Sequence, residues 1–221
     1  MKVSLVALTQ SHIPGITTAE DIIVYAARVS NPTNQHNTAT GERLLRYCIK
    51  HGHWSVFETA SMTLQIQTSR AIAAQILRHR SFTFQEFSQR YSEVEHFEAF
   101  ELRKQAETNR QSSCQTMRNQ DLEYNIRRFI GGAEALYREL LDAGVARECA
   151  RMVLPLCTQT TLYMTGSVRS WIHYFQQRLS EHTQKEHREV AQAAYELFKQ
   201  QFPTIANAIN TQTTETGGQP S

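Results

Sequence analysis

A segment of alternating apolar residues, followed at once by a helical segment, constrains the fold of this chain most strongly. Apolar side chains occupy every second position from Met62 to Ile66, which predicts a half-buried strand. Thr68 or Ser69 can then cap a helix that runs to about Arg80. A strand that leads directly into a helix limits how the neighbouring segments can pack.

The 75–92 stretch that follows is dense in arginine and polar side chains. Gln75, Arg78 and His79 are three and four positions apart and therefore share one face of the predicted helix. If the chain is extended after an aromatic loop, Ser88 and Arg90 point to the same side of it. A helix end and a strand start that both carry phosphate donors predict a nucleotide-binding cradle. Arginine-rich helix ends are also common because cations complement the helix dipole, so a solvated helix end or a nucleic-acid-binding patch stays open.

Composition narrows the function classes. The 221 residues are typical of one domain with its own core, and we expect a single catalytic domain over 1–210 and a disordered polar tail over 211–221. The net charge of +2 disfavours a nucleic acid partner, whereas the excess of arginine over lysine favours forked contacts with a small anion. Four cysteines without a CxxC pair, no signal peptide and no apolar run that could span a bilayer indicate a cytoplasmic protein with no membrane partner.

Periodicity predicts the other elements in outline. Strands are expected over 1–8 and 157–164, the second broken by Gly166, and helices over 21–28, 42–50, 121–141, 167–179 and 183–201. The apolar stripe of the 121–141 helix indicates core or interface. Residues 97–117 are polar and charged, which is compatible with a surface helix or with a loop over the site.

Four phrases of the sequence resemble motifs of one known family. Arg78-His79-Arg80, followed after seven residues by Ser88, resembles the signature of flavin-dependent thymidylate synthases. The phrases Ala26–Ser30, His51–Glu58 and Ala146–Pro155 resemble further motifs of that family. The resemblance implies an α+β fold in which mixed helices pack on a mainly antiparallel sheet. The chain has no GxGxxG, which argues against a Rossmann-type flavin site.

By position, the resemblance implies roles for individual residues. The flavin would contact Ser30, His53, Ser55, Arg78, His79, Arg80, Glu86, Ser167, Arg169 and His173. The substrate dUMP would contact Gln75, Arg78, Glu86, Phe87, Ser88, Gln89, Arg90, Arg147 and Arg178. Arg178 is the expected catalytic residue, because a fixed cation can stabilise negative charge on the pyrimidine ring.

Two local features, a pair of histidines and a helical arginine, have implications of their own. His51 and His53 could act as metal ligands, but no third ligand follows at a suitable spacing, so we predict no metal site. Arg147 is expected in the first turn of a helix, where a cation opposes the dipole. A residue that contradicts the local preference is a hint of function.

The reaction that the resemblance implies is reductive methylation of dUMP to dTMP. Methylenetetrahydrofolate donates the carbon, and FAD reduced by NADPH supplies the hydride. In the family, subunits of a homotetramer share the active sites, and we expect the same here. Two other interpretations stay open. The segment could belong to a nucleic-acid-binding module that stacks bases on its phenylalanines. The chain could also be a noncatalytic flavoprotein, because Ser167 and His173 stand where the family has asparagine.

Overall fold

The computed structural model describes residues 1–216 and confirms an α+β fold with an antiparallel central sheet. The sheet has the strand order β1-β2-β6-β3, and each neighbouring pair is antiparallel. The bounds are Lys2–Leu8 for β1, Ser61–Ser69 for β2, Gln159–Ser167 for β6 and Thr83–Glu86 for β3. Strands that are far apart in the sequence therefore lie side by side.

β2 and β6 form the centre of the sheet, and their sequences show why. Alternate residues of both strands are buried, and Leu64 and Met164 face each other in the register with no exposed surface. The opposite face carries half-exposed polar side chains, among them Thr63 and Thr165, whose hydroxyl oxygens lie 2.9 Å apart. One apolar and one polar face is the pattern of an antiparallel sheet that is covered on one side.

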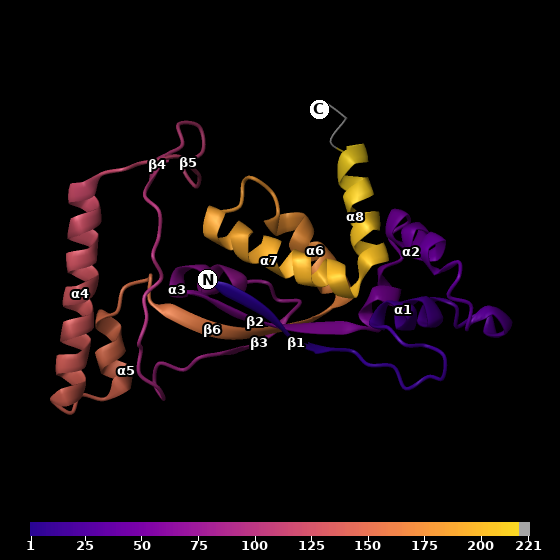
Figure 1. Ribbon diagram of the computed structural model, residues 1–221, viewed down its shortest axis with the longest axis horizontal. Coiled ribbons are helices and arrows are strands. Elements are labelled where there is room, and N and C mark those ends of the chain that lie inside the picture. The colour runs from indigo at the N-terminus through magenta and orange to yellow at the C-terminus, as the bar shows by residue number, and fades with distance from the viewer. Residues whose placement is uncertain (217–221) are drawn as a thin grey trace.

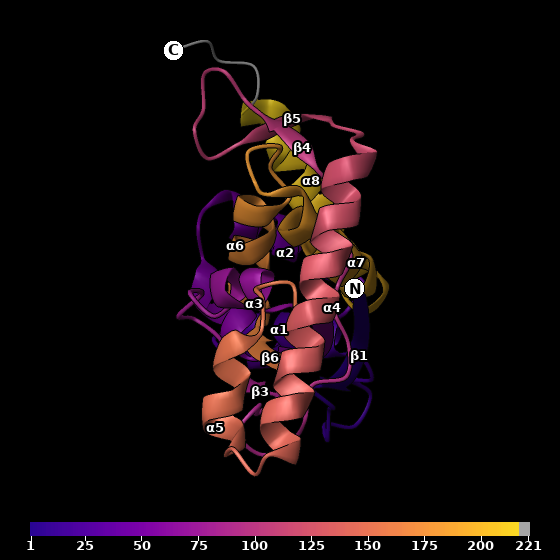
Figure 2. The same cartoon turned by 90° about the vertical axis from the view of Figure 1, so that its left-hand side faces the viewer.

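Helices cover the apolar face of the sheet and form both ends of the molecule (Figure 1). The α-helices are α1 Ala19–Ala27, α2 Gly41–Lys50, α3 Arg70–Ile76, α4 Gln120–Asp142, α5 Arg147–Ala150, α6 Val168–Arg178, α7 Lys185–Gln201 and α8 Pro203–Thr216. Shorter elements are the 3-10 turns η1 Pro32–Asn34, η2 Trp54–Glu58 and η3 Arg151–Val153 and the hairpin strands β4 Arg103–Gln105 and β5 Ser113–Thr116. α4 and α5 lie at one end and α1 and α2 at the other, and Figure 2 shows α4 beside α5. No helix in this part of the chain is long and apolar enough to cross a membrane.

The main core lies between the sheet and the layer of α6 and α7. Trp171 of α6 is fully buried and donates from Nε1 to a carbonyl of β2 at 3.1 Å. Its ring packs edge-on against Phe82, and Phe175 stacks on it one turn further along. Phe175 also contacts Phe198 of α7. These aromatic contacts hold α6, and therefore its last residue Arg178, at a defined place over the sheet.

Gly166 lies inside β6, so the prediction that it breaks this strand is wrong. It is paired with Met62 of β2, and β6 continues to Ser167. The ring of Phe82 occupies the space in which a Cβ of residue 166 would stand. Glycine is therefore required here for the close approach of a core side chain to the strand.

Replacing Gly166 with alanine is expected to lower the free energy of unfolding by about 1–3 kcal/mol, because the new methyl group displaces Phe82 from a packed core. Gly131→Ala in α4 is the matched control, since a Cβ there meets no atom within 4 Å. Alanine favours a helix over glycine by about 1 kcal/mol, so the control should be slightly more stable than wild type. Denaturant unfolding measures both, and a Gly166→Ala protein of wild-type stability would contradict the packing.

Three further segments bear on the prediction. Of the two roles predicted for α4, core or interface, its exposure favours interface: the helix buries Ala133 and Tyr137, whereas Leu122 is 43% and Phe129 65% exposed. Residues 97–117 contain the β4–β5 hairpin and no helix. α8 runs to Thr216 and so includes 211–216, the first part of the predicted disordered tail, while 217–221 lie outside the described residues.

Candidate active site

The arginine-rich segment occupies the end of α3 and the turn after it. Ser69 caps α3 by accepting a hydrogen bond from the first helical turn at 3.4 Å, in agreement with the sequence prediction. The helix ends at Ile76, earlier than predicted. The N–H groups of Arg78 and His79 bond to carbonyls three residues back, which tightens the chain into a turn. Arg78 and Arg80 are both exposed on this turn.

His79 and Arg178 form the central pair of the site. Arg178 donates from Nε to His79 Nε2 at 2.8 Å, which assigns the proton of the neutral imidazole to Nδ1. Burial, followed by the charges of Arg178 and His173, lowers the pKa of His79 to about 4. The described partner of Arg178 is thus a neutral ring and not a carboxylate. Its positive charge remains available to an anionic ligand.

Protein stability is expected to decline as the pH falls from about 6.5 towards 4. The pKa of His79 is about 4 in the folded chain, against an ordinary value of 6.5, so in this window the unfolded chain binds a proton that the folded chain does not. The contribution is complete above the ordinary pKa and is lost as the pH falls through the window. Burial, Arg178 and His79 also lower the pKa of His187, to about 3, which extends the loss.

The melting temperature, recorded across this pH range, tests the expectation. The decline should be steep in wild type and shallower in His79→Gln, which cannot take up the proton. His182→Gln changes an exposed histidine and should keep the wild-type profile. A wild-type melting temperature that stays constant down to pH 4 would contradict the neutral state of the buried rings.

A second group of arginines lies where α5 meets the turn after β3. Arg147, the first residue of α5, donates to Glu93 at 2.9 Å, and Arg90 lies 3.5 Å from Glu148. All four side chains are 45–67% exposed, and ion pairs of this kind contribute little to stability. A phosphate group can therefore compete with these carboxylates for the two guanidinium groups.

Residues 88–92 form a turn and not the extended segment that we considered from the sequence. The carbonyl of Ser88 accepts the N–H groups of Tyr91 and Ser92, each at 3.0 Å. The turn buries Gln89 and leaves its amide Nε2 without a hydrogen-bond partner in the described structure. A buried donor without a partner, next in sequence to Arg90, is a group that a ligand oxygen can satisfy.

Three of the predicted flavin residues, His53, Ser55 and Arg169, lie at η2. His53 immediately precedes η2, and its ring centre lies 5.6 Å from that of Tyr47. Arg169 of α6 donates to Glu58 at the end of η2 at 2.6 Å. Ser55, within η2, and Ser30, after α1, are both exposed. In the described residues, no group of three or more His, Cys, Asp or Glu side chains is arranged to hold a metal ion.

Several residues that were predicted to contact the flavin or dUMP already make hydrogen bonds to other side chains or to the backbone within the chain. Glu86 accepts from Arg70 at 2.7 Å and from Thr160 at 2.9 Å. Ser167 caps α6 by accepting from the N–H of Ser170 at 3.3 Å, and His173 is exposed and bonds to Gln177 at 2.8 Å. Phe87 is 37% exposed at the end of β3.

Figure 1 shows how the elements that carry these residues are distributed. α5, with the Arg90 and Arg147 group, lies at one end of the molecule, and α1 and α2 lie at the other. The turn after α3 and the end of α6, which carry His79 and Arg178, lie between them. One chain therefore spreads the predicted site residues along its length.

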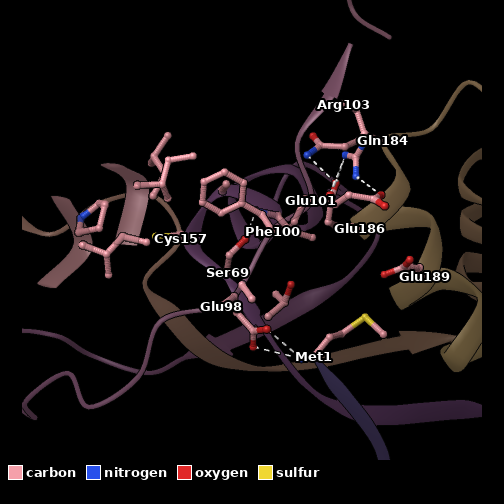
Figure 3. Close-up of a pocket in the computed structure, with 18 of the residues that line it drawn as sticks. Met1, Ser69, Glu98, Phe100, Glu101, Arg103, Cys157, Gln184, Glu186 and Glu189 are labelled. Carbon is pink, nitrogen blue, oxygen red and sulfur yellow. Dashed lines mark hydrogen bonds and ion pairs between the residues drawn. The ribbon is translucent and has the colours of Figure 1, made fainter. Parts of the chain in front are cut away.

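A separate cavity of about 570 Å³ lies between α4, the start of α3 and the start of α7 (Figure 3). Its walls are mainly apolar and include Phe100, Ile126 and Phe129. Arg103 forms an ion pair with Glu186 at 2.7 Å at its edge. None of the residues predicted for flavin or substrate contacts lines it, so the cavity belongs to the open face of α4.

Three residues beside the central pair were not predicted from the sequence. Tyr174 packs edge-on against His79, with ring centres 4.9 Å apart. His187, which is fully buried, lies 3.2 Å from the Tyr174 hydroxyl. Gln184 accepts from Gln75 at 2.7 Å. A signal for His187 existed, since it is a histidine on the otherwise apolar face of a helical segment.

The α+β fold, the arginine-rich turn after α3 and the Arg178 cation agree with the protein family that the sequence motifs resemble. The chain belongs to the thymidylate synthase complementing protein family, whose model matches residues 13–204. It is 49% identical over 214 residues to the probable flavin-dependent thymidylate synthase of Paramecium bursaria Chlorella virus 1, covering 95% of this chain and 99% of the relative. It is 50% identical over 198 residues to the flavin-dependent thymidylate synthase of Synechocystis sp., covering 86% and 89%.

A solved structure matches the chain over nearly its whole length. It is the UMP/dUMP methylase PolB from Streptomyces cacaoi bound with 5-Br dUMP. The TM-score is 0.81 at 28% identity, and the match covers 95% of this chain and 94% of that chain. The fold therefore agrees with the family assignment.

Proposed function

We propose that this chain is a flavin-dependent thymidylate synthase that converts dUMP to dTMP. Methylenetetrahydrofolate gives its methylene carbon to carbon 5 of dUMP, which loses a proton, and tetrahydrofolate is released. FAD, once reduced by NADPH, supplies the hydride that completes the methyl group. The observation that carries the proposal is the Arg178 cation, held by a neutral His79 beside an arginine-rich turn, in a chain about half identical to named synthases.

The residues of the turn fit a flavin dinucleotide. Arg78 and Arg80 are exposed, and neither makes an ion pair within the described residues. Two such guanidinium groups, two positions apart on one turn, suit the diphosphate of FAD, which needs fixed forked donors. His53, Ser55 and Arg169 around η2 are the further groups that we propose for the flavin, together with the exposed Ser30 after α1.

We assign the substrate to the remaining arginines. Arg90 and Arg147 bind the phosphate of dUMP, and Ser88 and the free amide of Gln89 add donors on the same turn. Arg178 acts on the pyrimidine: it stabilises the negative charge that develops when the ring loses the proton on nitrogen 3. His79 holds the guanidinium in place without neutralising it.

The active site is proposed to be shared between subunits of a homotetramer. α4 exposes apolar side chains, including Leu122, Phe129 and Leu136, that a partner subunit can cover. The distribution of predicted residues along the molecule supports the same idea, because a second copy can bring α5 next to the central pair of its neighbour. All four cysteines are free thiols, which supports our proposal of a cytoplasmic enzyme.

The test combines a spectrum with an assay. The protein is saturated with FAD, desalted and scanned with and without dUMP, and dTMP formation is then measured with NADPH and methylenetetrahydrofolate. A retained flavin band that dUMP perturbs, together with dTMP formation, supports the proposal. Retained flavin without turnover would favour the noncatalytic flavoprotein, and a colourless protein that binds single strands would favour the nucleic-acid module. UMP is the comparison substrate, because the solved relative is titled a UMP/dUMP methylase.

A further inference from the structure

A row of hydrogen-bonded side chains connects the buried face of α7 with the end of α3. His187 is fully buried and has a partner at each ring nitrogen. Gln75 Oε1 lies 3.2 Å from Nδ1, and the hydroxyl of Tyr174 lies 3.2 Å from Nε2. Gln75 continues the row by donating from Nε2 to Gln184 Oε1 at 2.7 Å. His187 has no part in the mechanism described above, although both of its partners adjoin residues that do.

The donors and acceptors of this row determine which nitrogen of His187 carries the proton. Gln184 donates from its own amide nitrogen to Glu186 at 2.9 Å, so its oxygen must accept from Gln75. The amide nitrogen of Gln75 is therefore used, and its oxygen faces Nδ1, which must donate. Nε2 then accepts the hydrogen bond of Tyr174. One neutral tautomer satisfies both partners.

The second partner of His187 leads to the central pair. The Tyr174 ring packs edge-on against His79 at 4.9 Å between ring centres, and the rings of His79 and His187 are 6.2 Å apart. His79 accepts the hydrogen bond of Arg178 at 2.8 Å. Through Nδ1, His187 thus orients the amide of Gln75. Through Nε2 it holds Tyr174, whose ring packs against His79, the partner of Arg178.

We propose that His187 is a positioning residue for dUMP, acting on substrate binding through Gln75 and on the catalytic cation through Tyr174 and His79. The inference rests on the proposed function, because it requires Gln75 and Arg178 to act on dUMP. It assigns a role in the reaction to a side chain that contacts neither substrate nor flavin.

Two substitutions of His187 separate its contact with Gln75 from its contact with Tyr174. In His187→Asn the amide nitrogen takes the place of Nδ1, so the donor to Gln75 is kept and the contact with Tyr174 is lost. In His187→Gln the longer side chain places its amide near the position of Nε2, so the partner of Tyr174 is kept and the donor to Gln75 is lost. Tyr174→Phe is the companion variant: it removes the hydroxyl but leaves the ring against His79.

Calorimetric titration of the FAD-loaded protein with dUMP, together with kcat and the melting temperature, gives the readouts. His187→Gln is expected to weaken dUMP binding about tenfold with little change in kcat, because one hydrogen bond that orients Gln75 is lost. His187→Asn and Tyr174→Phe are expected to keep dUMP affinity within about twofold and to lower kcat about tenfold. If dUMP affinity and kcat change equally in all three variants, in proportion to the fall in melting temperature, the proposal is overturned and His187 is only a core residue.

The failure of this inference can be distinguished from failure of the proposed function. Wild-type protein that binds and methylates dUMP, with no split between the Asn and Gln variants, overturns the inference alone. Wild-type protein that does not bind dUMP overturns both. Nitrogen NMR of protein labelled at histidine gives an independent readout that needs no ligand: the proton of His187 is expected on Nδ1, and a proton on Nε2 would overturn the proposed orientation of Gln75.

Discussion

Replacing Arg178 with alanine is expected to lower kcat for dTMP formation about 100- to 1000-fold while dUMP and FAD still bind. Arg178 lies at the end of a helix that its aromatic face anchors in the core, and His79 holds its Nε at 2.8 Å. A cation placed in this way stabilises charge that forms only as the pyrimidine reacts, so its loss raises the barrier more than it weakens binding. Single-turnover rates and dUMP titrations measure the two quantities separately.

Two control variants accompany this prediction. Arg46→Ala removes an exposed arginine of α2 whose partner is Glu42 one turn away, and it should leave kcat and dUMP affinity at wild-type values. His79→Gln keeps an acceptor for Arg178 in a neutral side chain and should retain more activity than Arg178→Ala. Wild-type turnover by Arg178→Ala would remove Arg178 from the mechanism.

Replacing Arg147 with alanine is expected to raise the dissociation constant of dUMP about 10- to 100-fold. The reason is the loss of charge-assisted hydrogen bonds to the phosphate, which contribute about 1.5–3 kcal/mol. Glu93→Gln is the matched control, because it removes the carboxylate that Arg147 binds at 2.9 Å and should leave dUMP affinity equal or higher. Deoxyuridine, which lacks the phosphate, should bind wild type and Arg147→Ala equally. A variant that binds dUMP as wild type does would place the phosphate elsewhere.

Mixed tetramers of Arg147→Ala and Arg178→Ala chains extend this prediction to the shared site. The assay uses dUMP well below the dissociation constant of the Arg147→Ala variant, so that each parent is nearly inactive. If each site takes Arg147 from one subunit and Arg178 from another, random mixing then restores about a quarter of the sites. Coexpression with two different tags isolates the mixed species. If both residues come from the same chain, no mixture regains activity, and the proposal of shared sites fails.

The local elements of this protein were predictable because their signals depend on near neighbours. The alternation of Met62–Ile66 predicted β2, and Ser69 is one of the two residues, with Thr68, that were predicted to cap the helix that follows. The motif around Arg78 led to the family, which the comparisons confirm. At Gly166 the prediction failed because distant residues decided the outcome. Gly166 remains within β6 because it pairs with Met62 of β2, and the ring of Phe82 takes the space that a side chain would need.

The candidate site was predictable as a set of residue types and only partly as an arrangement. The expected importance of Arg178 came from a motif, but its partner did not, because α6 and α3 are brought together only by their common packing against β6 and α7. His187 shares a helical face with Val190 and Ala191, a pattern that indicates burial. Its hydrogen bonds with Tyr174 and Gln75 cross three helices and carry no signature in sequence spacing.

The sequence by itself determined the two central strands, most of the longer helices, the family and the arginines that a nucleotide and a flavin need. It could do so because side-chain periodicity and short motifs are properties of adjacent residues. Only the tertiary structure decided that Arg178 meets a neutral histidine, that Gln75 is oriented by a buried one, and that Arg147 lies with Arg90 at one end of the molecule. These contacts join residues far apart in the chain, and they form only when the elements that carry them pack together.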